Sequence, residues 1–117
     1  DKILHAREIV KKVYVDERIE QYIADIVFAT RRPESYKMPE MKRYISFGGS
    51  PRAGINLALA GRTRAFLKHR GYVIPEDVRD VAYDVLRHRI GLTYEAEADN
   101  VTTDAIITEV INKVEVP

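Results

Sequence analysis

Six consecutive residues, Gly48-Gly49-Ser50-Pro51-Arg52-Ala53, combine the residue types that bind an anion at the start of a helix. Ser50 is a favoured N-cap, and Pro51 suits the first helical turn, where its missing N–H costs no hydrogen bond. Arg52 then places a cation at the positive end of the helix dipole, which is unfavourable by roughly 0.3–1 kcal/mol. An anion bound to the free N–H groups of that turn would offset this cost. The alternative interpretation is an arginine that simply extends into solvent.

The same stretch resembles the sensor-2 motif in the lid domain of AAA+ ATPases, and it is most similar to the MoxR family, in which Gly-Ala-Ser-Pro-Arg-Ala is usual. Gly49 in place of alanine is the one departure within the motif, and we expect it only to loosen the approach to the helix. Three further blocks follow the family's pattern in the same order: Pro75-Glu76-Asp77-Val78, Leu86-Arg87-His88-Arg89-Ile90 and Tyr94-Glu95-Ala96-Glu97-Ala98. The resemblance therefore covers almost the whole chain.

This resemblance implies one all-α lid domain over residues 1–117, a fragment whose ATPase core lies upstream. It implies that Arg52 is the catalytic residue and reaches the γ-phosphate of ATP held by that core. Ser50 and Pro51 would set its position, and Ala53 would line the edge of the nucleotide site. For the parent protein it implies ATP and Mg²⁺ and neighbouring subunits in a ring-shaped oligomer. We expect a cytoplasmic location, with which the absence of cysteine is compatible. It also implies chaperone-like remodelling of client proteins, among them proteins with von Willebrand factor A domains.

The rest of the chain offers little independent chemistry. It contains neither a Gly-x-x-x-x-Gly-Lys-Ser/Thr loop nor a Gly-x-Gly-x-x-Gly fingerprint, so we expect the chain alone to be inactive as an ATPase. The Walker motifs, the Mg²⁺ ligands and any arginine finger are expected upstream. His5, His69 and His88 are far apart in sequence and the chain has no cysteine, so no metal site is predicted.

Two charged groupings, both within residues 84–89, have ordinary interpretations. Asp84 and His88 lie one helical turn apart and are predicted to form a surface pair. The cluster at 87–89 is predicted to be solvated or paired with Glu95 and Glu97, rather than to contact a partner.

Composition indicates a single folded domain without a specialised partner. The chain has 117 residues, of which 45% are hydrophobic and 32% charged, as in an ordinary globular protein. The net charge of +1 gives no reason to expect nucleic acid or an acidic membrane surface. No apolar run approaches the roughly 18 residues of a membrane span. The chain starts at Asp1 directly in a helical pattern, which we interpret as a piece of a longer protein.

Hydrophobic periodicity predicts five helices, over residues 1–12, 16–32, 51–70, 75–89 and 102–114. The second helix has one buried stripe: Ile19, Tyr22, Ile23, Ile26, Val27 and Thr30. The central helix has two candidate faces and is expected to pack on more than one side: Ile55, Ala58, Leu59, Arg62, Phe66 and His69 on one, Leu57, Ala60, Arg64 and Leu67 on the other. Residues 33–49 are predicted as an ordered loop with one turn near 40–44, and residues 92–100 as irregular. Tyr14 and Tyr72 are predicted to lie in two very short paired strands.

The helix ends are marked by capping residues, with one exception. Asp16 and Thr102 are predicted N-caps, and Gly71 is the predicted stop of the central helix. Ile74 occupies the N-cap position of the helix at 75–89, where its apolar side chain should cost about 1 kcal/mol. We expect Ile74 to point outward.

Two other classes of function fit a small helical domain. A helix-turn-helix DNA-binding module would place the first residues of the helix at 75–89 toward the bases, but these include Glu76 and Asp77, which phosphates would repel. A helical protein-binding adaptor would need an exposed apolar groove, which a sequence cannot reveal.

Overall fold

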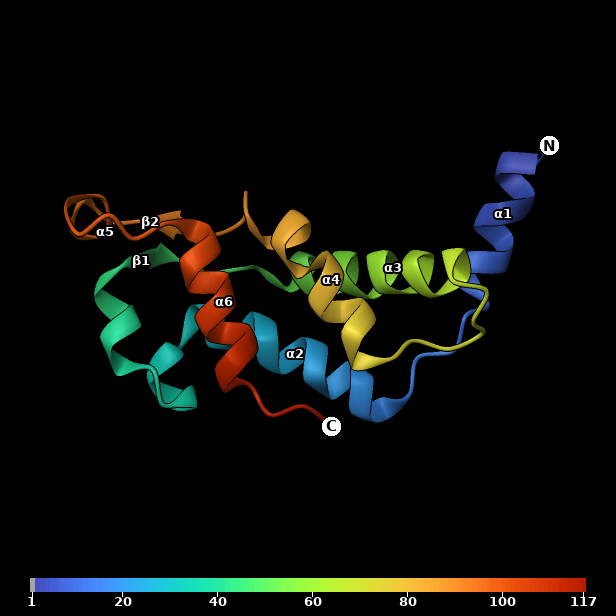
Figure 1. Ribbon diagram of the computed structural model, residues 1–117, viewed down its shortest axis with the longest axis horizontal. Coiled ribbons are helices and arrows are strands. Elements are labelled where there is room, and N and C mark those ends of the chain that lie inside the picture. The colour runs from blue at the N-terminus through green and yellow to red at the C-terminus, as the bar shows by residue number, and fades with distance from the viewer. Residues whose placement is uncertain (1) are drawn as a thin grey trace.

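The long helix α3 (Pro51–Leu67) lies at the centre of the structure, and other helices pack along it (Figure 1). The computed structural model describes residues 2–117, without the side chains of Lys2 and Leu4. The other elements of this described part are α1 (Lys2–Lys11), α2 (Glu17–Arg31), the 3₁₀-helices η1 (Pro33–Tyr36) and η2 (Pro39–Arg43), β1 (Ile45–Phe47), α4 (Pro75–Leu86), β2 (Gly91–Leu92), α5 (Tyr94–Ala98) and α6 (Thr103–Lys113). The predicted all-α class is confirmed. The helix expected over residues 1–12 corresponds to α1, and Asp1 itself lies outside the described residues.

The prediction of five helices is wrong, because residues 94–98 form α5. The Thr93 side chain caps this helix by accepting a hydrogen bond from the Ala96 N–H at 3.2 Å. A helix of five residues is shorter than two turns, so no hydrophobic period could reveal it. Residues 33–49 hold the predicted turn as η2, together with η1 and β1, which were not predicted.

The small sheet also differs in part from the prediction. β1 pairs antiparallel with β2, with Ile45 opposite Leu92 and Phe47 opposite Gly91. The predicted pairing of Tyr14 with Tyr72 is present, as an isolated parallel bridge rather than as two strands. This bridge ties the segment after α1 to the segment before α4.

Helix α2 buries the face that its periodicity predicts. Every residue of the predicted stripe on α2 is buried. The predicted caps are confirmed: the Asp16 carboxylate accepts from the Arg18 N–H at 2.9 Å, and the Thr102 hydroxyl accepts from the Ala105 N–H at 3.1 Å. These caps satisfy N–H groups that a helix leaves open in its first turn.

Helix α3 packs on several sides, as expected, since it contacts α1, α2 and α4. Its fully buried row, however, follows neither of the predicted faces. The row is spaced by four residues and consists mainly of small side chains: Ala53, Leu57, Gly61 and Ala65. Ile55 and Leu59, both on one predicted face, are 69% and 51% exposed. Small side chains let α4 and the segment before it approach closely: a Cβ added to Gly61 would lie 3.9 Å from a methyl of Val78 on α4 and 3.5 Å from one of Val73.

The corner between α3 and α4 corrects two further predictions. The helix ends at Leu67 rather than near residue 70, and His69 takes the left-handed conformation (φ 60°) expected of Gly71. The His69 N–H bonds to the Phe66 carbonyl and the Arg70 N–H to the Ala65 carbonyl, both at 2.9 Å, which closes the helix end. Helix α4 likewise ends at Leu86, three residues earlier than predicted.

A buried ion pair crosses the same corner and replaces the missing N-cap. Arg70 donates to both carboxylate oxygens of Asp77, at 2.6 and 2.7 Å, and the Ile74 N–H donates to Asp77 at 3.0 Å. Burial disfavours the charged carboxylate, but these hydrogen bonds outweigh burial and hold the pKa of Asp77 below its ordinary value. Ile74 has no side-chain acceptor and is half-buried, so it does not point freely outward as expected.

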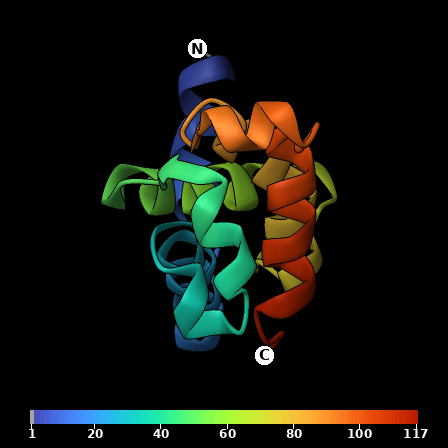
Figure 2. The ribbon, with the colours of Figure 1, turned by 90° about the vertical axis from the view of Figure 1, so that its left-hand side faces the viewer.

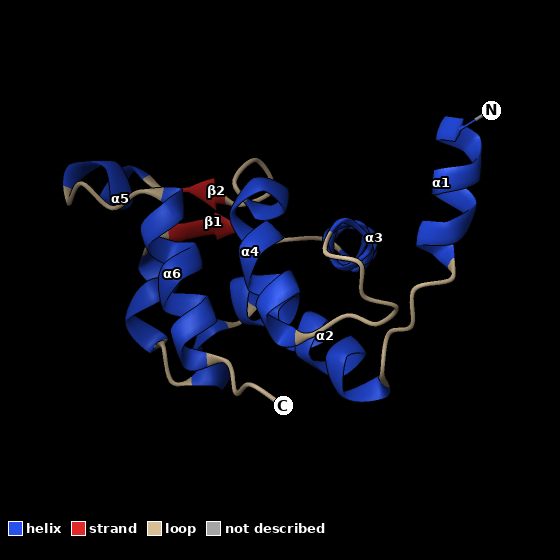
Figure 3. Ribbon diagram, turned by 45° about the vertical axis from the view of Figure 1, so that its right-hand side comes forward, coloured by secondary structure: helices blue, strands red, loops and turns tan. Residues whose placement is uncertain are grey.

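The elements spread along one long axis, with overall extents of 49 × 28 × 21 Å. Helix α1 lies at one end of this axis (Figure 3), where it contacts α3. The sheet, α5 and the 3₁₀-helices lie at the opposite end, where α6 runs beside α4 (Figure 2). The first turn of α3 therefore faces the sheet end of the molecule, away from α1 (Figure 1).

Candidate functional site

The first turn of α3 leaves its positive end open. Ser50 occupies the N-cap position with extended backbone, as predicted, but its side chain makes no capping hydrogen bond. No acidic residue lies in that turn. Pro51 has no N–H, and the Ala53 N–H bonds to the Ser50 carbonyl at 2.9 Å. A site for an anion is therefore available here, because neither a capping side chain nor a carboxylate neutralises the helix terminus.

Arg52 is exposed at this open end. Across the part of the chain that the structure describes, no hydrogen-bond or ion-pair partner contacts its guanidinium. Arg43, Arg64, Arg70 and Arg87 differ in this respect, since each lies within 4 Å of a carboxylate. Arg52 is thus a cation available to a group outside this chain.

The loop before Arg52 lies directly against α2. A Cβ added to Gly48 would overlap the carbonyl of Thr30 and would lie 2.7 Å from the backbone nitrogen of Arg31, so only glycine fits at 48. At Gly49 an added Cβ would lie 3.2 Å from the Cβ of Ala53, which is tighter than ordinary contact. Glycine at 49 therefore relieves a crowded position and keeps the loop close to the core.

An open apolar groove of about 490 Å³ runs beside this turn, between α2 and α3. Gly54 lies along its floor, where an added Cβ would meet methyl groups of Ile23 and Val27 at 3.9 Å. The exposed side chains of Phe28 and Ile55 line it from the two helices. Its lining is completed by Glu20, Ala24, Arg31, Pro51 and Ala58. Because Pro51 takes part, the groove opens next to the turn that carries Arg52.

A second aromatic residue fixes Phe28. The rings of Phe28 and Tyr36 meet edge to face, with centroids 6.1 Å apart and planes at 67°. The Tyr36 hydroxyl donates to Asp25 at 2.9 Å, and partial burial together with this carboxylate raises the pKa of Tyr36 to about 12. Tyr36 thus anchors the start of the segment at 33–49 to α2.

The predicted site residues do not all reach the surface. Ser50 and Pro51 are exposed beside Arg52, and Pro51 also lines the groove. Ala53 is fully buried in the core row of α3. This burial indicates that Ala53 holds the first turn of α3 in the core, and its place at the edge of a nucleotide site stays a prediction.

Comparison with known proteins assigns this architecture. A family model described as the AAA lid domain matches residues 40–110, which include the first turn of α3, the α3–α4 corner and α5. The chain belongs to the AAA lid domain family.

Relatives of this lid domain carry MoxR names. It is 41% identical over 115 residues to the chaperone MoxR1 of Mycobacterium tuberculosis, covering 98% of this chain and 30% of that protein. It is 33% identical over 100 residues to the protein MoxR of Methylorubrum extorquens, covering 80% of this chain and 29% of the relative. A solved structure of a candidate ATPase from Cytophaga hutchinsonii superposes with a TM-score of 0.91 at 44% identity, covering 94% of this chain and 33% of the other. The predicted resemblance to a MoxR-family AAA+ lid is confirmed, and the lid domain spans about a third of the length of these relatives.

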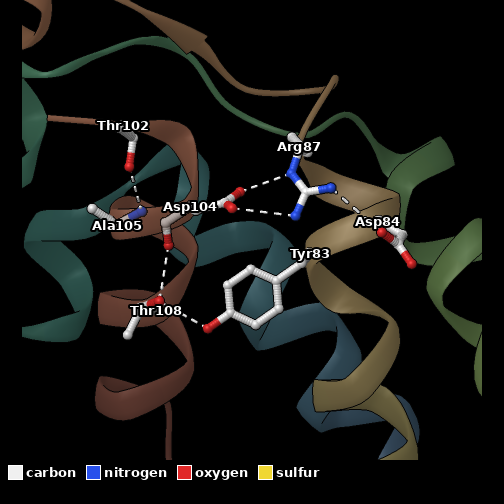
Figure 4. Close-up of polar contacts among 7 residues, drawn as sticks. All are labelled: Tyr83, Asp84, Arg87, Thr102, Asp104, Ala105 and Thr108. Carbon is white, nitrogen blue, oxygen red and sulfur yellow. Dashed lines mark hydrogen bonds and ion pairs between the residues drawn. The ribbon is translucent and has the colours of Figure 1, made fainter.

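The charged cluster after α4 has a structural role in the lid domain. Arg87 donates to both carboxylate oxygens of Asp104 on α6, at 2.8 and 3.2 Å, and its third nitrogen lies 3.5 Å from Asp84 (Figure 4). Tyr83 and Thr108 add a 2.8 Å hydrogen bond between the same two helices. Within the cluster Arg87 is paired, but its partners are Asp104 and Asp84 rather than Glu95 or Glu97.

Among the described residues, Asp84 pairs with Arg87 and not with His88, the predicted partner. No group of three or more histidine, aspartate or glutamate side chains that could hold a metal ion occurs among residues that the structure places. Within that same part of the lid domain, no helix is both long and apolar enough to cross a membrane.

Proposed function

We propose that this lid domain closes over ATP bound by an AAA+ core and that Arg52 is its sensor-2 residue. The observation that carries the proposal is the exposed guanidinium of Arg52, which has no partner among the described side chains and stands at an uncapped helix terminus beside an open apolar groove. A nucleoside triphosphate has both groups that this site could bind. Its phosphates would lie against the arginine and the helix terminus, and its aromatic base would lie in the groove.

In this proposal Arg52 contacts the γ-phosphate and stabilises the charge that develops on it during transfer to water. Charge stabilisation by a positioned cation is the main contribution that a protein makes to phosphoryl transfer. Pro51 and Ser50 fix where α3 begins, and buried Ala53 holds that turn in the core. The phosphate loop and the Mg²⁺ ligands would come from the ATPase core, together with any arginine finger.

The groove between α2 and α3 is proposed to take the base of the nucleotide. Its apolar walls and the absence of a side chain at Gly54 suit a flat ring. For the whole protein we propose a ring of subunits in the cytoplasm, where ATP is available. We further propose that lid closure drives remodelling of client proteins, among them proteins with von Willebrand factor A domains.

Filling the groove tests the proposed binding mode. Gly54→Leu in the full-length protein should raise the Kd for ATP roughly tenfold, because burying an aromatic ring contributes about 1.5–3 kcal/mol and about 1.4 kcal/mol is tenfold in Kd. Gly54→Ala is the matched control: its methyl meets Ile23 and Val27 at ordinary contact distance and should leave the Kd nearly unchanged. Calorimetric titration with a non-hydrolysable ATP analogue measures both. An unchanged Kd in a folded Gly54→Leu protein would exclude the groove as the base site.

The lid domain by itself should neither turn over ATP nor bind it at sub-millimolar concentration, because its sequence lacks a phosphate loop. Steady-state phosphate release and calorimetry on the purified 117-residue chain provide the measurement. Turnover above the buffer control would contradict the proposal that ATP hydrolysis requires the phosphate loop of the ATPase core.

A helical adaptor remains the second candidate, because the structure has the exposed apolar groove that such a function needs, together with exposed Leu59 and Leu67 on α3. The Gly54→Leu titration separates the two candidates, since an adaptor would show no change in ATP binding. The helix-turn-helix alternative gains no support from the start of α4, where Asp77 is buried against Arg70.

A further inference from the structure

A single buried hydroxyl joins the end of α2 to the loop that precedes Arg52. Thr30 is the second-last residue of α2, and its side chain is fully buried. Within residues 2–117, Thr30 and Asp77 are the polar or charged residues described as buried. Asp77 is paired with Arg70, which leaves the role of the Thr30 hydroxyl to be explained.

The two hydrogen bonds of Thr30 have a fixed direction. Its hydroxyl donates to the Val27 carbonyl at 2.6 Å, in the preceding turn of α2. Because a hydroxyl has one proton, its oxygen is then left as an acceptor, and it accepts the Gly49 N–H at 2.8 Å. That N–H is buried and needs a partner, so the hydroxyl is a specific anchor for the loop.

Gly48 and Gly49 also lie directly against α2 around this hydrogen bond. Gly48 packs on the Thr30 backbone with no room for a side chain. A Cβ at Gly49 would lie 3.5 Å from the Thr30 hydroxyl oxygen. Only Ser50 and Pro51 separate Gly49 from Arg52, and the φ angle of Pro51 is restricted by its ring. The anchor therefore determines where the first turn of α3 starts.

We propose that Thr30 is a positioning residue for Arg52 and holds the guanidinium where it meets the transferring phosphate. The proposal rests on the function proposed above for Arg52. Beyond the first turn, the buried row of α3 continues through Leu57, Gly61 and Ala65, and Gly61 lies against Val73 and Val78. Loss of the hydroxyl therefore displaces the loop and the first turn while the remaining turns of α3 stay packed.

The test compares three threonine variants in the full-length protein. Thr30→Val keeps the shape but removes both hydrogen bonds, and it should lower kcat for ATP hydrolysis roughly 10- to 100-fold, as expected for a catalytic group misplaced by about 1 Å. The KM for ATP should change far less. Thr30→Ser retains the hydroxyl and should keep kcat close to that of the wild type. Thr63→Val is the matched control, because the Thr63 hydroxyl donates within α3, to the Leu59 carbonyl at 3.0 Å, and does not contact the loop.

A double-mutant cycle shows whether Thr30 acts through Arg52. In an Arg52→Ala background, Thr30→Val should change kcat by no more than about twofold, because the group that it positions is already gone. Equal and independent losses in the two backgrounds would overturn the positioning role. So would full activity of Thr30→Val or an equal loss from Thr63→Val. If Arg52→Ala alone leaves kcat unchanged, the proposed function of Arg52 fails, and the role of Thr30 fails with it.

Folding of the variants is checked by circular dichroism at the assay temperature. Thr30→Ala, which removes the hydroxyl and adds no bulk, replaces Thr30→Val if the valine variant does not fold. If neither folds while Thr30→Ser does, the hydroxyl serves the fold as a whole, and the positioning role is overturned.

Discussion

Arg52→Ala in the full-length protein is expected to lower kcat for ATP hydrolysis by roughly 100-fold or more, the scale on which a positioned charge stabilises a transition state. Nucleotide affinity should change far less, because the contact strengthens as charge develops on the γ-phosphate. The fold should be unaffected or slightly more stable, since Arg52 is exposed and lies at the positive end of α3. Steady-state ATPase assays, nucleotide titrations and melting curves measure the three effects.

Two further variants identify the cause of this loss. Arg52→Lys should restore little activity, because an ammonium group cannot reproduce the planar fork of a guanidinium on a phosphate. Arg79→Ala removes another exposed arginine, on α4, and should leave kcat unchanged, which controls for the loss of one positive charge. Full ATPase activity in a well-folded Arg52→Ala protein would refute the sensor-2 assignment.

Arg70→Leu should produce the largest loss of stability, about 3–5 kcal/mol in the free energy of unfolding, because it leaves a buried carboxylate without its counter-charge. The side chain of Asp77 is 0% exposed, and that of Arg70 is 20% exposed. Asp77→Asn should cost less, because the side-chain oxygen that remains can still accept the Ile74 N–H, and Arg70 reaches water. Denaturant unfolding of the lid domain measures both variants.

A surface pair provides the control for this prediction. Arg87→Leu breaks the ion pairs to Asp84 and Asp104, whose side chains are 85% and 51% exposed. Solvated carboxylates lose little when their partner is removed, so the loss should be much smaller than for Arg70→Leu. Equal losses from the two variants would show that burial of Asp77 does not determine its contribution.

The pH dependence of the wild type follows from the lowered pKa of Asp77. In the folded state the pKa of this carboxyl is depressed, so its stabilisation is fully present above the unfolded-state pKa of about 4. It is lost as the pH falls through the folded-state pKa. In Arg70→Leu the buried carboxyl should instead have a raised pKa, so protonation should relieve part of the loss at low pH. Unfolding curves between neutral and acidic pH would show this reversal.

The sequence alone determined the features that depend on local chemistry. The caps at Asp16 and Thr102 and the buried stripe of α2 follow from side chains within a few turns of one another, so the order of residues is enough to predict them. The run at 48–53 is likewise recognised from contiguous residues, and the family match includes it. Helix α3 begins at Pro51, as these residues predict.

The tertiary structure alone decided the features that depend on distant partners. Helix α3 has apolar residues around its whole circumference, so periodicity could not tell that Ala53, Leu57, Gly61 and Ala65 face the core while Ile55 is exposed. Asp77 has the pattern of an ordinary first-turn acid, and only the fold places Arg70 against it. The pairing of β1 with β2, about 45 residues apart in the chain, leaves no local signal in strands this short.

The candidate site also contains residues that the sequence predicted and residues that only the structure revealed. Arg52 was predicted from its neighbours in sequence, whereas the groove floor at Gly54 and the anchor at Thr30 were not. Thr30 matched the apolar stripe of α2, and nothing in that periodicity indicates that its hydroxyl holds Gly49, 19 residues away. A sequence gives the chemistry of each side chain, but contacts between separate segments arise only when the chain packs, because each depends on the path of the intervening residues.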